Sequence, residues 1–74
     1  MNPQVVTIGL GYIGLPTSAL IASKSTHVLG VDINQKVVDT VNDGKIHIVE
    51  PELADLVNMA VTQGTLRATS QPKP

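Results

Sequence analysis

The stretch VVTIGLGYIGLPTSALIAS, residues 5–23, decides the fold of this chain. It carries no charged side chain, and Gly9, Gly11 and Gly14 give it the spacing G-x-G-x-x-G. A run of about 18 apolar residues is also the length at which a transmembrane helix is suspected. The stretch therefore has two interpretations: a membrane or signal segment, or a glycine loop that holds a phosphate.

The residues around the stretch argue against a membrane or signal segment. The preceding residues, MNPQ, contain none of the Lys or Arg of a secretory signal. Pro16 and the glycines interrupt the apolar run, and Lys24-Ser25-Thr26 leads into a second strand-like run instead of a cleavage site. We therefore expect a cytoplasmic chain with no membrane contact.

The composition is that of one small globular domain. The 74 residues are 42% hydrophobic and 15% charged, with a formal net charge of -1, so no basic surface for nucleic acid is indicated. Tyr12 is the one aromatic residue, which argues against a base-stacking surface. The sequence has no cysteine, which excludes a disulfide, a thiolate metal site and a cysteine nucleophile within it. No metal site is expected.

Hydrophobic periodicity predicts the element order β-α-β-α-α-β. Apolar, β-branched runs predict strands at residues 5–9, 27–32 and 65–69. Helices are predicted from about 15 to 23, from 34 to 43 and from 50 to 64. The residues predicted to form the buried face of the first helix are Ile13, Thr17, Leu20 and Ile21.

Residues at the predicted helix ends support these boundaries. Asn34 is an N-cap residue, and Pro51 suits the first position of the third helix. Gly44 and Gly64 follow the second and third helices, where glycine adopts the left-handed conformation. Glu50 and Glu52 are expected to be helix-start charges.

Strands that alternate with helices imply right-handed crossovers and a parallel sheet. The predicted fold class is therefore α/β: a partial Rossmann fold with three parallel strands in the order 3-2-1, which is one half of a doubly wound sheet. Residues 1–74 are expected to form a single truncated subdomain, with 71–74 as a polar tail.

The glycines have the context of a dinucleotide-binding loop, because they follow a strand and open a helix. Gly9 permits the tight turn, Gly11 lets the backbone approach a pyrophosphate, and Gly14 lets the helix pack on the sheet. The helix N-terminus supplies unpaired N–H groups and a positive dipole end for the anion. The competing interpretation is that the glycines only make a tight turn.

Asp32 follows the second strand and is the second half of this site. Adjacent parallel strands lie roughly 4.8 Å apart, so the ends of the first two strands are neighbours. A carboxylate there accepts hydrogen bonds from both ribose hydroxyls of an adenosine. It repels a 2′-phosphate, and no arginine stands at Ile33 or Asn34, which favours NAD over NADP. The alternative is that Asp32 caps a turn.

His27 and His47 have no paired base or cysteine nearby in the sequence and are predicted to be structural.

With these residues in place, the chain resembles the amino-terminal part of the UDP-glucose/GDP-mannose dehydrogenase family. The resemblance covers roughly residues 4–72 and rests on IGLGYIGLPTSALIAS (8–23), VLGVDINQKVVDTVNDG (28–44) and IHIVEPELADLV (46–57). The strings GYIGLP, GVDIN and VEPEL are much more specific than G-x-G-x-x-G alone.

The resemblance implies a larger enzyme that uses two NAD molecules in succession to oxidise the C6 alcohol of a UDP-sugar to a carboxylate, for surface polysaccharide synthesis. It also implies a homo-oligomer and a cysteine that carries the intermediates. Because this chain has no cysteine, it is expected to bind NAD weakly and to catalyse nothing alone. The NAD contacts implied by the resemblance fall on Gly9, Gly11, Tyr12, Ile13, Gly14 and Asp32, with Tyr12 and Ile13 contributing mainly backbone N–H groups.

Two other interpretations stay open from the sequence. The chain could be a binding module for adenosine or FAD, since FAD proteins share the glycine loop. It could also be a structural mini-domain that folds without any ligand. Copurified flavin absorbance would indicate the first, and a melting temperature independent of ligand would indicate the second.

Overall fold

A computed structural model describes residues 3–50 and 52–71. The predicted element order is confirmed. Pro51 and residues 72–74 of the expected tail lie outside the described residues. The elements are β1 (Val5–Ile8), α1 (Gly14–Ala22), β2 (Val28–Val31), α2 (Gln35–Asn42), α3 (Leu53–Gln63) and β3 (Leu66–Thr69).

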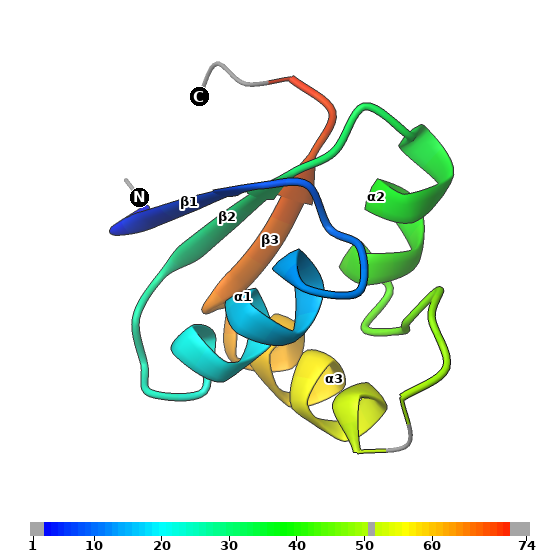
Figure 1. The fold of residues 1–74 in the computed structure, drawn as a ribbon. Helices are drawn as coiled ribbons and strands as arrows, with labels where there is room; N and C mark the ends of the chain where they lie inside the picture. Colours follow the sequence, from blue (N-terminus) through cyan, green and yellow to red (C-terminus); the bar gives the residue numbers. More distant parts are fainter. Residues whose placement is uncertain (1–2, 51, 72–74) are drawn as a thin grey trace.

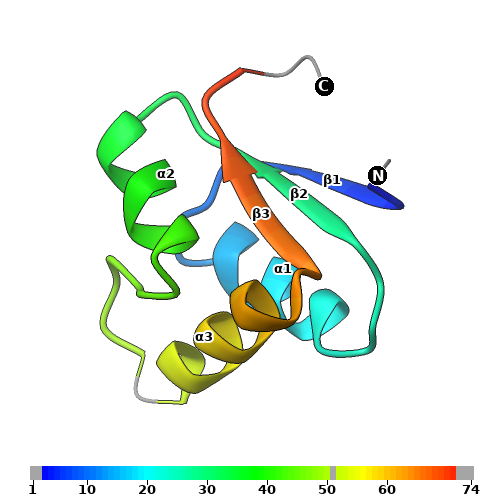
Figure 2. The same ribbon diagram turned by 180° about the vertical axis from the view of Figure 1, so that it is seen from behind.

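The three strands form one parallel sheet in the order β1-β2-β3, which confirms the predicted α/β class and strand order. Val28 of β2 stands between Val5 of β1 and Leu66 of β3 in the register. Figures 1 and 2 show α1 and α3 packed against the same face of this sheet, with α2 beside β3. The strands therefore all end at one edge, where the loops after β1 and β2 lie next to each other.

The core lies between the sheet and the helices. Val28 and Leu66 point into it, and the partly buried Val5 packs against it. The helical spacing of Leu53, Leu56, Val57, Ala60 and Val61 predicts one buried stripe. In α3, Leu53, Val57 and Ala60 are buried in this core, and Leu56 and Val61 pack against it. Val38 and Val41 do the same for α2.

The predicted buried face of α1 is wrong for Ile13, Thr17 and Leu20, whereas Ile21 is partly buried and packs against the core. Ile13 is 84% exposed and Leu20 is 57% exposed, whereas the buried side chains are Leu15, Ser18, Ala19 and Ala22. Three of these four buried side chains are small, which lets α1 lie close to the sheet, and Gly14 at its start meets the Gly9 carbonyl. Ser18 is completely buried and its hydroxyl donates to the Gly14 carbonyl at 2.7 Å, so it fits this face without an unpaired polar atom.

The helix ends follow the predicted chemistry. The Asn34 side chain accepts a hydrogen bond from the Lys36 N–H, as expected of an N-cap. Gly64 ends α3 with a φ of +83°. Glu52 occupies the N-cap position of α3 but makes no side-chain capping bond, and Asp55 supplies the acidic charge of the first turn.

Asn42, at the end of α2, covers the outer edge of β3. Its side-chain nitrogen donates to the Ala68 carbonyl at 2.9 Å, and its side-chain oxygen accepts from the Ala68 N–H at 2.8 Å. This side chain thus occupies the outward-facing backbone groups of Ala68, where a neighbouring strand would otherwise pair. No helix in the described part of the chain is long and apolar enough to cross a membrane.

Candidate functional site

The glycine loop connects β1 to α1, and its three glycines have different local environments. Gly9 has a φ of +91°, a conformation that other residues adopt only with strain. A Cβ on Gly14 would overlap the carbonyl oxygen of Gly9, so Gly14 is required for the helix to start here. A Cβ on Gly11 would have no atom of the described structure within 4 Å. The fold therefore requires glycine at positions 9 and 14 but not at 11.

Leu10 fixes this loop to the sheet. Its side chain is completely buried, and a Cβ on Gly30 of β2 would lie 2.6 Å from its Cδ2 atom. Its backbone N–H donates to Oδ2 of Asp32 at 2.9 Å. The contact between Leu10 and Gly30 is not predicted from the sequence. A glycine in the middle of an otherwise apolar strand was the available signal, because such a glycine often marks a close approach.

Asp32 lies where β2 ends, directly beside the glycine loop. Oδ2 accepts the Leu10 N–H, and Oδ1 accepts the Asn34 N–H at 2.9 Å. These backbone hydrogen bonds from Asn34 and Leu10 lower the pKa of Asp32; the charge of nearby His47 also lowers it, while desolvation opposes the shift. The carboxylate is therefore ionised at neutral pH. It caps the turn into α2, as the alternative interpretation held, and it also ties the loop to β2.

A shallow hollow opens above the ends of β1 and β2. Its lining residues are Ile8, Gly9, Val31, Asp32 and Ile33. The side chain of Ile33 is 96% exposed and offers an apolar surface next to the Asp32 carboxylate. Charged and apolar surfaces thus meet at one point, which suits a ligand with a polar sugar and an apolar ring.

The six predicted site residues lie on this edge of the sheet, but their side chains differ in exposure. Tyr12 and Ile13 are 70% and 84% exposed, so neither side chain belongs to the core. This is compatible with the expectation that both residues contribute mainly through the backbone. The contacts themselves stay predictions.

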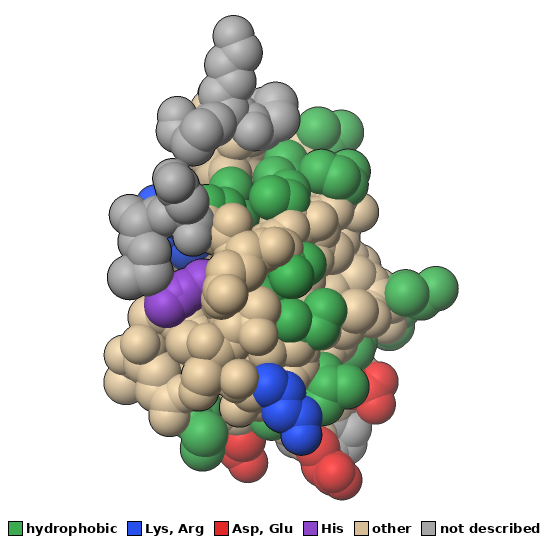
Figure 3. Space-filling model, turned by 90° about the vertical axis from the view of Figure 1, so that its left-hand side faces the viewer, with side chains coloured by type: hydrophobic (Ala, Val, Ile, Leu, Met, Phe, Trp, Pro, Cys, Tyr) green, Lys and Arg blue, Asp and Glu red, His purple; other side chains and the backbone are tan. Residues whose placement is uncertain are grey.

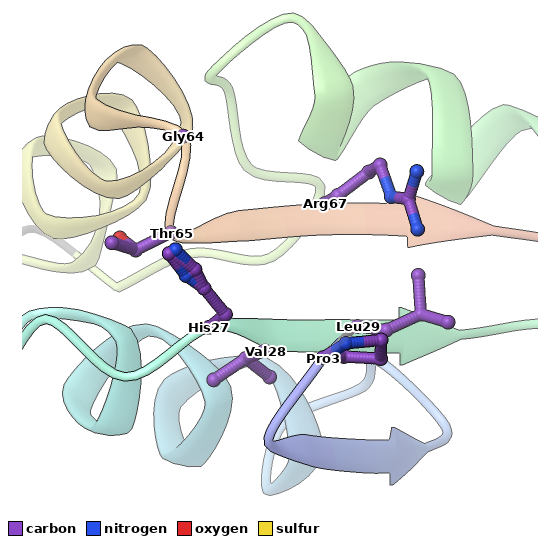
Figure 4. A pocket seen from close by; sticks show the side chains of 7 residues that line it. All are labelled: Pro3, His27, Val28, Leu29, Gly64, Thr65 and Arg67. Atoms are coloured by element: carbon purple, nitrogen blue, oxygen red, sulfur yellow. The ribbon is translucent and has the colours of Figure 1, made fainter. Parts of the chain in front are cut away.

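His27 lies at the opposite ends of the strands and takes no part in this site. Figure 4 shows its ring directed toward Thr65, in a pocket of about 150 Å³ that Arg67 also lines. Both ring nitrogens are buried without a hydrogen-bond partner among the described residues. Those residues also contain no cluster of His, Asp or Glu that could hold a metal ion.

Comparison with known proteins identifies the family. The model of the NAD-binding domain of the UDP-glucose/GDP-mannose dehydrogenases matches residues 3–73. This chain belongs to that family. The matched domain binds NAD, so NAD is the cofactor of this part of the family's fold.

Several relatives are similar over almost the whole chain. A UDP-N-acetyl-D-mannosamine dehydrogenase of Campylobacter jejuni is 60% identical over 95% of the chain, and an NDP-N-acetyl-D-galactosaminuronic acid dehydrogenase of Ralstonia nicotianae is equally identical over the same share. The chain spans only 17% and 16% of the length of these two relatives.

Solved structures show the same arrangement of elements. The UDP-N-acetyl-mannosamine dehydrogenase of Staphylococcus aureus superposes on 92% of the chain with a TM-score of 0.88 at 43% identity. The GDP-mannose dehydrogenase of Pseudomonas aeruginosa superposes on 92% with a TM-score of 0.90 at 32% identity. Each match covers 16% of the solved chain.

Substituting the glycines separates the requirements of the fold from those of the site. Gly14→Ala should lower the free energy of unfolding by about 2–3 kcal/mol or more, because its Cβ meets backbone that cannot move aside. Gly11→Ala, the matched control, should leave it unchanged or raise it by up to about 1 kcal/mol, since the unfolded chain loses freedom and nothing clashes. Urea denaturation followed by circular dichroism measures both. Equal losses for the two variants would contradict this assignment of roles.

The lowered pKa of Asp32 predicts a specific loss of stability in acid. A group whose pKa is depressed by folding stabilises the native state above its unfolded pKa of 3.8, and this contribution disappears as the pH falls through the folded value. The free energy of unfolding of the wild type should therefore be larger than that of Asp32→Asn by a constant amount above about pH 5. This difference in free energy should become smaller below about pH 4. Urea denaturation from pH 2 to 7 measures this difference. A difference independent of pH would show that the carboxylate charge does not hold the loop.

Proposed function

We propose that this chain binds the ADP half of NAD at the glycine loop and Asp32, as the cofactor-binding part of a sugar-nucleotide 6-dehydrogenase. The proposed contacts are the backbone of the loop and of the start of α1 for the pyrophosphate, and the Asp32 carboxylate for the adenosine ribose. The residues that would make them are Gly9, Gly11, Tyr12, Ile13, Gly14 and Asp32.

The observation that carries the proposal is the open space at Gly11. Gly9 is explained by its φ and Gly14 by its contact with Gly9, but no conformational or packing requirement explains Gly11. A position where a side chain would touch nothing in the protein, at the start of a helix, is where a phosphate group can approach the backbone most closely. The loop therefore fits a pyrophosphate without any lysine or arginine beside it.

Asp32 supports NAD as the dinucleotide. A carboxylate offers about four lone-pair sites. Two are used by the N–H groups of Leu10 and Asn34, which leaves acceptor capacity for two ribose hydroxyls. The carboxylate is ionised at neutral pH, so it would repel the 2′-phosphate of NADP. The exposed side chain of Ile33 could pack against the adenine ring.

The activity of the whole protein is proposed from its relatives. Relatives at about 60% identity are dehydrogenases of UDP-N-acetyl-D-mannosamine. We propose that the whole protein is an oxidoreductase that acts on this substrate and converts its C6 alcohol to a carboxylate with two NAD molecules. The cysteine that this chemistry requires would come from outside these residues, since the chain has none. We further propose that the whole enzyme is a cytoplasmic homo-oligomer and that this chain alone is not catalytic.

Titration calorimetry with NAD and NADP tests the assignment of the ribose contact. Asp32→Ala should weaken NAD binding about tenfold or more, because hydrogen bonds to a charged acceptor are worth about 1.5–3 kcal/mol each. It should also reduce the preference for NAD over NADP, because the repulsion of the 2′-phosphate is lost. Any loosening of the loop affects both dinucleotides equally, so the change in their ratio isolates the ribose contact.

Two further variants complete this experiment. Gly11→Val should abolish binding of both dinucleotides while the circular dichroism melt stays close to that of wild type, because its side chain enters open space. Asp43→Ala, at the C-cap of α2, is the matched control and should leave the affinity for NAD unchanged. An Asp32→Ala variant that keeps both the affinity and the NAD preference of wild type would refute the proposal.

A further inference from the structure

The sheet has a depression on its helix-covered face, in the row of residues next to the glycine loop. In the register, the three strands contribute Thr7, Gly30 and Ala68 to this row. The row before it carries the larger side chains of Val5, Val28 and Leu66. Because Gly30 has no side chain, the row leaves a space at the middle of β2, the central strand of the three.

The side chain of Leu10 fills this space. A Cβ on Gly30 would lie 2.6 Å from its Cδ2 atom, 2.9 Å from Cδ1 and 3.1 Å from Cγ. Hydrophobic side chains reach the surface in a band on one face of the molecule, as Figure 3 shows, whereas Leu10 is completely buried although it belongs to a loop. A close-packed interior leaves Leu10 no room to move aside. The size of residue 30 therefore decides how closely the loop lies against the sheet.

The position of Leu10 determines the position of Gly11, the next residue in the loop. The Gly9 N–H donates to the Val31 carbonyl at 2.7 Å, and the Leu10 N–H donates to Oδ2 of Asp32 at 2.9 Å. These two bonds and the Leu10 side chain hold the first half of the loop on β2. Consecutive Cα atoms are about 3.8 Å apart, so Leu10 cannot leave β2 without displacing Gly11.

We propose that Gly30 is a positioning residue for the dinucleotide, which acts through Leu10 and touches no ligand itself. The inference rests on the proposed function, in which the pyrophosphate approaches the backbone at Gly11. Gly30 is buried in the middle of β2, and its missing side chain lets Leu10 lie against the sheet. The depth of Leu10 then sets where the N–H groups of the loop meet the pyrophosphate. The combined volume of residues 10 and 30 therefore controls the affinity for NAD.

Moving an isopropyl group from one position to the other tests this pair. Leu10→Ala removes Cγ, Cδ1 and Cδ2, which are the atoms that a Cβ on Gly30 would meet, and Gly30→Val adds an isopropyl group there. In titration calorimetry, Gly30→Val should weaken NAD binding about tenfold or more, because a small displacement of a binding group is costly. Leu10→Ala should weaken it about threefold or more, because the loop loses its apolar anchor. The double variant should bind NAD within about threefold of wild type, since exchanges that conserve core volume are tolerated best.

A control variant separates loop position from general stability. Val57 is completely buried in α3, so Val57→Ala should lower the urea concentration at the unfolding midpoint. Its affinity for NAD should stay within about twofold of wild type, because distant sites act independently.

Amide exchange at Leu10 gives a measurement that needs no ligand. The Leu10 N–H is held by Asp32 in the wild type. In Gly30→Val it should exchange about tenfold faster or more, because the loop lifts from β2 and this bond opens. In the double variant the exchange rate should return toward that of wild type. If Gly30→Val does not fold, Gly30→Ala replaces it, with smaller changes in the same direction.

The outcomes distinguish this inference from the proposed function. A folded wild-type chain that binds no NAD refutes the proposed function. Wild-type binding that Gly30→Val leaves intact overturns only the role of Gly30, as does a folded double variant that restores neither the affinity nor the exchange rate. An equal loss of affinity in Val57→Ala also overturns it, since binding would then follow stability alone.

Discussion

The anchoring of Leu10 is the constraint on which the rest of the structure depends. This residue lies inside the glycine loop, yet its side chain is completely buried beneath β2, in the space left by Gly30. Its N–H is held by the Asp32 carboxylate. The side chain of Leu10 therefore holds the loop through an apolar contact, and its backbone N–H holds it through a charge-assisted hydrogen bond. With Leu10 fixed, the path of the chain from β1 into α1 is determined, and Gly14 must then pass against the Gly9 carbonyl.

The same arrangement connects stability to binding. Asp32, at the end of β2, holds the loop after β1 through the Leu10 N–H and its own turn through the Asn34 N–H, and its carboxylate remains ionised at neutral pH. The carboxylate proposed to accept the ribose hydroxyls is thus already oriented by the fold, and under this proposal its negative charge would select against a phosphorylated ribose. In the proposed complex the loop would offer the pyrophosphate its backbone and a helix N-terminus, so a chain with a net charge of -1 could hold an anion. Because the fold already holds these groups in place, less conformational entropy is lost when a ligand binds.

Much of this could be predicted from the sequence because it depends on local patterns. The strand order, the buried stripes of α2 and α3, the Asn34 cap and the position of Asp32 beside the loop all follow from periodicity and turn chemistry. The buried face of α1 could not be predicted, because hydrophobicity favours Leu20 and Ile13, whereas close approach to the sheet selects Ala19 and Ser18. The contacts of Leu10 with Gly30 and of Asn42 with Ala68 were also missed. Both join residues far apart in the chain. Gly30 within a strand indicates a close approach, but no local pattern says which residue makes it.

The central claim is that a dinucleotide binds across the glycine loop and the end of β2. Titration of the ¹⁵N-labelled chain with NAD, followed by amide chemical shifts, tests it most directly. The account predicts the largest shifts at the amides of residues 9–14 and 32–34, with little change around His27 and Thr65 at the opposite ends of the strands. Shifts confined to the pocket of His27 and Thr65, or a folded chain with no shifts at Gly11 and Asp32, would contradict it.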